Sequence, residues 1–244
     1  MGNITTIGII GLGNAGAPIL NNLNKSNKYK LVAFDIDTKK LNDIPKNIIK
    51  ATSIKNLAEQ CNVVLTCLPK PEHVLEAVGG EKGLLQNAST GMVWIDTSTT
   101  NFKQTKKLAT KASTYGVSML EATLTGGVHA LQNNNMVCLA GGDEVTFKLW
   151  KEVLQDAIGE VVVLCGKVGA GAIAKVVSNM LAFTNMVAAS ECMMIAKKAG
   201  LDLENFFDAI RVSAGNSFAW ETVVPHIFNQ KYESGFTMDL ACKD

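Results

Sequence analysis

Residues 6–23 read TIGIIGLGNAGAPILNNL, a β-branched run that leads into a glycine-rich turn and then into a helical pattern. Gly11, Gly13 and Gly16 form a G-x-G-x-x-G pattern, which is informative here because it follows a predicted strand and opens a predicted helix. In that setting the three glycines allow a tight turn, close approach to a pyrophosphate, and close helix–strand packing. The helix N-terminus adds amide donors and positive potential for phosphates. The stretch therefore predicts a dinucleotide-binding α/β unit; the alternative is a glycine turn that binds nothing.

The same rhythm of short apolar strands and helical segments continues to about residue 166. Apolar runs of this kind, separated by helical segments, are typical of a parallel sheet that is covered on both faces. We therefore predict an α/β fold in which a Rossmann-type, mostly parallel sheet domain spans residues 1–166. The predicted strands are 6–11, 30–35, 62–69, 92–96, 116–122, 135–142 and 160–166.

From residue 167 to 244 the pattern changes to helix. Residues 169–198 predict one long connecting helix that is buried on most sides, and GLDLENFFDAIRVS (200–213) predicts a second helix of an all-α domain. A membrane span over 172–196 is the competing interpretation. Polar side chains within it argue against a span, because such groups are costly in hydrocarbon: Lys175, Asn179, Asn185 and Glu191.

Composition narrows the class of protein. Hydrophobic residues make up 47% of the 244, charged residues 18%, and the net charge is +1, which predicts a sizeable core and argues against nucleic-acid or membrane partners. Six scattered cysteines without C-x-x-C pairs favour reduced thiols in a cytoplasmic protein, and we expect no signal peptide. The three histidines lack ligand spacing, so no metal site is predicted.

Asp35 ends the second predicted strand, 24 residues after Gly11, where a carboxylate can bind the adenosine ribose hydroxyls. An NADP site usually places an arginine next, but this chain has Ile36 and then Asp37. Two carboxylates would repel a 2′-phosphate, so NAD is favoured over NADP. Asp37 could instead cap the following helix.

The order of these and later motifs resembles the β-hydroxyacid dehydrogenase family, which includes 3-hydroxyisobutyrate dehydrogenase, along essentially the whole chain. GLGNAGAPILNNL (11–23), CLPKPEHV (67–74) and IDTSTT (95–100) match the family's cofactor motifs. The proline expected shortly after the third motif is replaced by Asn101 and Phe102. The resemblance implies that the cofactor contacts Gly11, Leu12, Gly13, Asn14, Ala15, Gly16, Leu68, Pro69 and Thr99.

LEATLTGGVHA (120–130) is similar to the family's substrate motif D-A-P-V-S-G-G, with Glu121, Thr123 and Thr125 replacing aspartate, proline and serine. The resemblance implies that the Thr125 hydroxyl and the amides of Gly126 and Gly127 receive a substrate carboxylate. A hydroxyl beside two unhindered backbone donors is a physically reasonable anion pocket. A Thr-Gly-Gly turn between strands is the structural alternative.

VGAGAIAKVVSN (168–179) is similar to the family's G-x-G-x-x-x-K-x-x-N-N motif, with Ser178 in the first asparagine place. The resemblance implies that Lys175 is the catalytic acid–base residue and that Asn179 assists. Their i, i+4 spacing puts both on one helix face. The alternative is a lysine that extends from a buried helix to water.

GFTMDLACKD (235–244) resembles the family segment in which Lys243 contacts the cofactor and Phe236 lies near the substrate. Family members continue for roughly fifty more residues, as expected for a complete two-domain enzyme, so the helical domain is expected to be truncated.

Together these features predict an oxidoreductase that transfers a hydride between NAD and a small 3-hydroxy acid or semialdehyde, assembled as a homo-dimer or homo-tetramer. One alternative is an NADPH-dependent reductase of glyoxylate, succinic semialdehyde or tartronate semialdehyde. Another is a non-catalytic NAD-binding protein.

Overall fold

The computed structural model describes residues 5–126 and 131–229. The chain divides into two compact units, Met1–Lys175 and Val176–Asp244. Phe236 and Lys243, predicted above as substrate and cofactor contacts, lie outside the described residues, as does Gly127.

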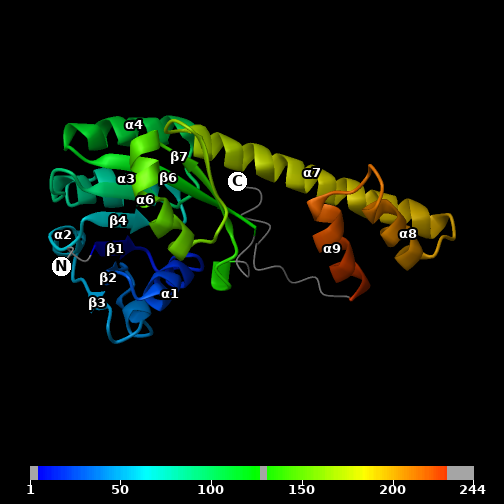
Figure 1. The fold of residues 1–244 in the computed structure, drawn as a ribbon, viewed down its shortest axis with the longest axis horizontal. Coiled ribbons are helices and arrows are strands. Elements are labelled where there is room, and N and C mark those ends of the chain that lie inside the picture. The colour runs from blue at the N-terminus through cyan, green and yellow to red at the C-terminus, as the bar shows by residue number, and fades with distance from the viewer. Residues whose placement is uncertain (1–4, 127–130, 230–244) are drawn as a thin grey trace. The chain divides into compact units, whose positions relative to one another are not determined.

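The first unit is built on one eight-stranded sheet with the order β3-β2-β1-β4-β5-β6-β7-β8 (Figure 1). Every neighbouring pair is parallel except β6 and β7, which are antiparallel. The described strands are β1 (Thr6–Ile10), β2 (Lys30–Phe34), β3 (Ile49–Lys50), β4 (Val63–Thr66), β5 (Val93–Asp96), β6 (Ser118–Thr125), β7 (Val137–Gly141) and β8 (Val162–Gly166).

Helices cover both faces of this sheet (Figure 1). Several begin at a side chain that accepts a backbone amide, as Asn101 does from Gln104 and Asp143 does from Thr146. The helical elements of the first unit are α1 (Gly16–Ser26), η1 (Thr38–Leu41), α2 (Ile54–Ala58), α3 (Pro71–Gly79), η2 (Leu84–Gln86), α4 (Phe102–Thr114) and α6 (Glu144–Ala157).

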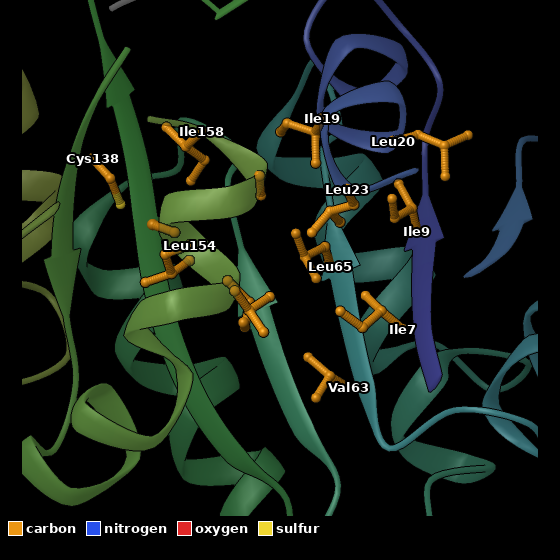
Figure 2. Packing of buried hydrophobic residues seen from close by; sticks show 14 of the residues in the cluster. Ile7, Ile9, Ile19, Leu20, Leu23, Val63, Leu65, Cys138, Leu154 and Ile158 are labelled. Atoms are coloured by element: carbon orange, nitrogen blue, oxygen red, sulfur yellow. The ribbon is translucent and has the colours of Figure 1, made fainter. Parts of the chain in front are cut away.

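Successive residues of a strand point to opposite faces of the sheet, and the core follows this alternation. On one face, Ile7 and Ile9 of β1 belong to one core cluster with Leu23 of α1 and Leu154 of α6 (Figure 2). On the other face, Val64 of β4 and Trp94 of β5 pack with α2, α3 and α4. The predicted coverage of the central strands on both faces is therefore confirmed.

Three features of the sheet were not predicted. β3 is only two residues long, too short for a periodic signal. β7 runs antiparallel to β6, and strand direction is decided by tertiary pairing that an apolar run does not encode. β8 lies at an edge, where Val163 is 46% exposed and Val161, just before the strand, is 52% exposed, so the prediction of full coverage is wrong for this strand.

Helix α7 (Ala170–Lys198) confirms the predicted long helix but not its burial. It is long and apolar enough to cross a membrane by length and composition, and only 17% of its most apolar window is buried within the described residues. Apolar composition shows that a segment favours burial, but it does not identify what covers the segment. Large apolar residues of α7 that are at least 45% exposed are Ile173, Val176, Val177, Met180, Leu181, Val187, Met194 and Ile195.

The second unit adds α8 (Leu203–Arg211) and α9 (Phe218–Phe228) to the later part of α7. Asp202 caps α8 by accepting the Asn205 amide, within the segment predicted to be helical. Trp220 is almost fully buried, and its indole N–H donates to the Phe207 carbonyl at 3.1 Å. Ala189, Met193 and Val224 complete this small core. Assembly into a homo-oligomer stays a prediction.

Candidate dinucleotide and substrate site

The candidate site lies at the carboxyl edge of the parallel strands. β2 pairs with β1 on one side and β4 pairs with β1 on the other, so the strand order reverses at β1. In open α/β sheets, ligands bind outside the carboxyl ends of the strands at the point where the strand order reverses. The predicted cofactor residues Gly11, Leu68 and Thr99 follow β1, β4 and β5, so all three loops belong to this edge.

The glycine loop after β1 is shaped by contacts that exclude side chains. Gly11 has φ of 97°, and a Cβ there would meet the Cys67 carbonyl oxygen. A Cβ on Gly16 would overlap the Gly11 carbonyl oxygen, since α1 starts directly against the loop. A Cβ on Gly13 would meet nothing within 4 Å. Gly11 and Gly16 thus serve the fold, whereas Gly13 leaves open space outside the loop, as close approach by a pyrophosphate requires.

The start of α1 also fits an anion. Its N-cap residue is Ala15, no side chain of the described residues caps it, and its first turn contains no acidic residue. Asn14 is exposed and Ala15 is half-buried. Amide groups and the helix dipole at such an end favour a phosphate. The residues present therefore fit the pyrophosphate of a dinucleotide.

Asp35 is buried, at 5% exposure, and its carboxylate holds the glycine loop. Oδ2 accepts the Leu12 amide at 2.7 Å and lies 3.2 Å from Lys40 Nζ, while Oδ1 accepts the Asp37 amide at 2.8 Å. A carboxylate offers about four acceptor positions, so one remains on Oδ1 for a ribose hydroxyl. Asp37 caps η1 by accepting the Lys39 amide, which is the capping role considered for it above.

The loops after β4 and β5 are joined by a buried network that motif reasoning missed. The Ser98 hydroxyl accepts the Leu68 amide at 2.9 Å, and the Ser98 amide donates to Asp96 Oδ1 at 3.1 Å. The Thr66 hydroxyl donates to the same Asp96 oxygen at 2.8 Å and accepts from Trp94 Nε1 at 2.9 Å. The sequence did contain a signal for this network, because the carboxylate of Asp96 at the end of a strand is followed two residues later by the hydroxyl of Ser98.

This network holds Leu68 close to Gly11, since a Cβ on Gly11 would lie 2.8 Å from Leu68 Cδ2. Pro69 follows and is exposed, and Thr99 is half-buried beside Ser98. Burial raises the pKa of Asp96 to about 6, against the opposing hydrogen bonds from Ser98 and Thr66. The structure thus brings Gly11 and Leu68 together. Contacts of the cofactor with these two residues, and with Pro69 and Thr99, remain predictions.

Of the predicted substrate residues, Thr125 and Gly126 are described, and they lie at the far end of β6. Asp96, the last residue of β5, pairs with Glu121, so β6 continues for four residues beyond the edge of its neighbour. Thr125 ends the strand and is half-buried. Gly126 follows with φ of 123°, a conformation that favours glycine, and is exposed. Thr125 and Gly126 are thus presented past the carboxyl edge.

Lys175 lies in the second turn of α7 and is only 9% exposed, and Asn179 follows one turn later, also at 9%. The i, i+4 spacing puts both on one face of α7, as predicted. Within the described residues, no cluster of three or more His, Cys, Asp or Glu side chains is arranged to hold a metal ion.

The sheet, the glycine loop and the uncapped start of α1 define a Rossmann-type dinucleotide-binding protein. Two family models cover the chain: the NAD binding domain of 6-phosphogluconate dehydrogenase matches residues 6–166, and the NAD-binding domain of NADP-dependent 3-hydroxyisobutyrate dehydrogenase matches residues 169–244.

Proteins with similar sequences and structures support the same family as these two models. Human mitochondrial 3-hydroxyisobutyrate dehydrogenase is 31% identical over 250 residues, covering 98% of this chain and 73% of the relative. A probable 3-hydroxyisobutyrate dehydrogenase of Mycobacterium bovis is 30% identical over 249 residues, covering 99% and 83%. The solved Mycobacterium tuberculosis 3-hydroxyisobutyrate dehydrogenase with L-serine superposes with a TM-score of 0.90 at 28% identity, covering 98% of this chain and 84% of that one.

The chain belongs to the β-hydroxyacid dehydrogenase family. It is therefore an oxidoreductase that uses a nicotinamide dinucleotide.

Proposed function

We propose that this enzyme interconverts a small 3-hydroxy acid and its semialdehyde with NAD, as expected for a protein similar to 3-hydroxyisobutyrate dehydrogenase. The observation that carries the proposal is the arrangement of β6. This strand ends in Thr125 beyond the carboxyl edge of the sheet, and its side chains also bind the first turn of α7, the helix that carries Lys175. A candidate carboxylate pocket and a candidate proton donor are thus held by one strand.

The proposed roles follow from the chemistry of each group. The Thr125 hydroxyl and the Gly126 amide donate hydrogen bonds to the substrate carboxylate. Lys175 exchanges a proton with the substrate oxygen that alternates between hydroxyl and carbonyl. Asn179, on the same face of α7, orients the substrate or the Lys175 amine by hydrogen bonding. The bound nicotinamide supplies the hydride acceptor or donor.

Preference for NAD is supported by the end of β2. Ile36 occupies the place after Asp35 and is 94% exposed, so an uncharged side chain stands where an arginine would bind a 2′-phosphate. The carboxylates of Asp35 and Asp37 lie on either side of it in the sequence and would repel that phosphate.

One observation favours the alternative of an NADPH-dependent reductase of a small semialdehyde. Lys40 Nζ lies 3.2 Å from Asp35 Oδ2 and its side chain is 43% exposed, so a cation is present at this end of β2. Turnover with NADH and NADPH, measured side by side, separates the two cases. A clear preference for NADPH would overturn the interpretation of Asp35 and Ile36.

The activity itself is tested with a panel of small 3-hydroxy acids and NAD⁺, using the full chain. General acid–base groups contribute about 10²–10⁴ in rate, so Lys175→Ala should lower kcat by at least about 100-fold and leave NAD⁺ binding intact. Lys167→Ala is the matched control, because Lys167 is exposed and lies just before the same helix. A Lys175→Ala variant with wild-type kcat would show that Lys175 is not the acid–base residue.

A further inference from the structure

Glu121 is a buried carboxylate, and the proposed reaction assigns it no chemical role. It lies in β6 at 2% exposure, and burial raises its pKa, against the amides of Gly169, Gly171 and Ala172, which lower it. Glu121 Oε2 accepts the Gly169 amide at 2.5 Å and the Gly171 amide at 3.3 Å. These amides begin α7, so a side chain about fifty positions earlier caps this helix.

The surroundings of Glu121 are shaped for this contact. A Cβ on Gly141 of β7 would collide with Glu121 Oε2. A Cβ on Gly171 would lie 2.8 Å from the Leu139 carbonyl oxygen and 3.3 Å from Glu121 Cβ. Only glycine at both positions lets the carboxylate, β7 and the start of α7 approach one another this closely.

Thr123 makes a second connection from the same face of β6. Its hydroxyl lies 2.9 Å from the Leu139 carbonyl oxygen and 3.2 Å from the Gly171 carbonyl oxygen, and the residue is 3% exposed. Side chains two apart in a strand share a face, so Glu121, Thr123 and Thr125 lie in one row. The first two hold the start of α7, and the third ends the strand at the candidate carboxylate pocket.

Burial of Glu121 at this position is unfavourable in free energy. Its second oxygen, Oε1, is buried and has no hydrogen-bond partner among the described residues. Leaving a buried acceptor unpaired is unfavourable, and an apolar side chain of similar size would avoid this penalty. Such a side chain could not, however, accept the α7 amides. A negative charge at a helix N-terminus is also favoured by the helix dipole.

We propose that Glu121 and Thr123 are positioning residues, which fix the first turns of α7 on β6 and thereby set the placement of Lys175 relative to Thr125. The inference rests on the proposed function for the roles of Lys175 and Thr125. Both side chains are departures from the family motif that this chain resembles, which has aspartate and proline at these places. In this chain, both departures contact the start of α7.

The test compares Glu121→Met, which fills the volume but accepts no hydrogen bond, with Glu121→Gln, which keeps an acceptor for the α7 amides. Small misplacements of a reacting group cost up to about 100-fold in rate. Glu121→Met should therefore lower kcat about tenfold or more while the Kd for NAD⁺ stays within about twofold, and Glu121→Gln should stay within about threefold of wild-type kcat. Tyr29→Phe is the control, because it removes a hydroxyl bond to Asp156 elsewhere in the same unit.

Wild-type kcat in a folded Glu121→Met variant would overturn the proposal. If Glu121→Met does not fold, Thr123→Val decides: it keeps the side-chain shape and removes the hydroxyl, and we expect kcat to fall about threefold with NAD⁺ binding unchanged. An unchanged kcat in Thr123→Val would then refute a positioning role.

A second measurement does not depend on turnover, so it separates failure of this inference from failure of the proposed function. The Lys175 side chain is buried, and labelling of its amine by acetic anhydride can be followed by mass spectrometry. Release of the α7 start in Glu121→Met or Thr123→Val should speed labelling of Lys175 severalfold, whereas Tyr29→Phe should match wild type. Equal labelling rates in all variants would contradict the inference even if no substrate is turned over.

Discussion

The carboxylate of Asp35 accepts the backbone amide of Leu12, with Oδ2 and the amide nitrogen 2.7 Å apart. This bond ties the end of β2 to the glycine loop that follows β1. Asp35, which is predicted to be a ribose ligand because of its position, thus also holds the glycine loop in place. Changes at Asp35 should affect cofactor affinity and folding together, whereas changes at neighbouring exposed residues should separate the two.

Replacing Asp35 by Asn should both destabilise the protein and weaken NAD⁺ binding. In asparagine an NH₂ group replaces one of the two carboxylate oxygens. It would face the backbone N–H of either Leu12 or Asp37, and two donors cannot form a hydrogen bond. An unpaired buried donor costs about 1–3 kcal/mol of unfolding free energy, and loss of the charged ribose acceptor should weaken NAD⁺ binding about tenfold or more. Urea unfolding and NADH fluorescence titration measure the two effects. Asp37→Asn is the control, because asparagine also caps helices well and Asp37 is exposed.

Ile36→Arg should improve use of NADP. The side chain is 94% exposed, so arginine is accommodated without repacking, and its guanidinium can bind a 2′-phosphate in a bidentate manner. We expect kcat/KM for NADP to rise about tenfold or more, with little change for NAD. Ile36→Gln supplies a polar side chain without charge; an equal gain in that variant would argue against an electrostatic cause.

Alanine at Gly13 should affect mainly NAD⁺ binding, whereas alanine at Gly16 should affect mainly stability. Gly13→Ala places a methyl group in open space, so we expect a Tm near that of the wild type but NAD⁺ binding weakened about tenfold or more. Gly16→Ala forces the methyl group against the Gly11 carbonyl oxygen and should cost about 1–3 kcal/mol of stability. Thermal unfolding with and without NAD⁺ checks both. Normal NAD⁺ affinity in Gly13→Ala would mean that the pyrophosphate does not approach this loop.

Asp96 should make stability depend on pH. Its pKa is about 6 in the folded protein against 3.8 as the ordinary value, so between these pH values the folded state retains a proton that the unfolded state has lost. The contribution of Asp96 to stability therefore falls as pH rises from about 4 to 6, by an amount on the order of 3 kcal/mol, and this contribution is constant above that range.

Asp96→Asn isolates this effect, because asparagine keeps an oxygen for the Ser98 amide and the Thr66 hydroxyl but does not titrate. The difference in unfolding free energy between wild type and Asp96→Asn, measured by urea unfolding from pH 4 to pH 8, should decline to pH 6 and then level off. A difference that stays constant across this range would show that Asp96 ionises normally in the folded state.

The sequence by itself determined that the first unit is an α/β domain with a mostly parallel sheet, and it determined where the glycine loop lies. Alternating apolar residues such as Ile7 and Ile9 specify a strand locally, and the spacing of Gly11, Gly13 and Gly16 specifies a turn that opens a helix. Both signals are carried by neighbours along the chain, and for that reason α1, α7 and all the strands except the two-residue β3 could be predicted without coordinates.

Only the tertiary structure decided the direction of β7, the exposure of α7, the partners of Asp35 and the contact between Glu121 and the start of α7. Glu121 and Gly169 are 48 positions apart, and neither residue alone carries a periodic or motif signal for the other. Such contacts depend on which strands pair and how closely a helix approaches them. These are properties of the packed chain, in which glycine at 141 and 171 leaves room that a local pattern does not reveal.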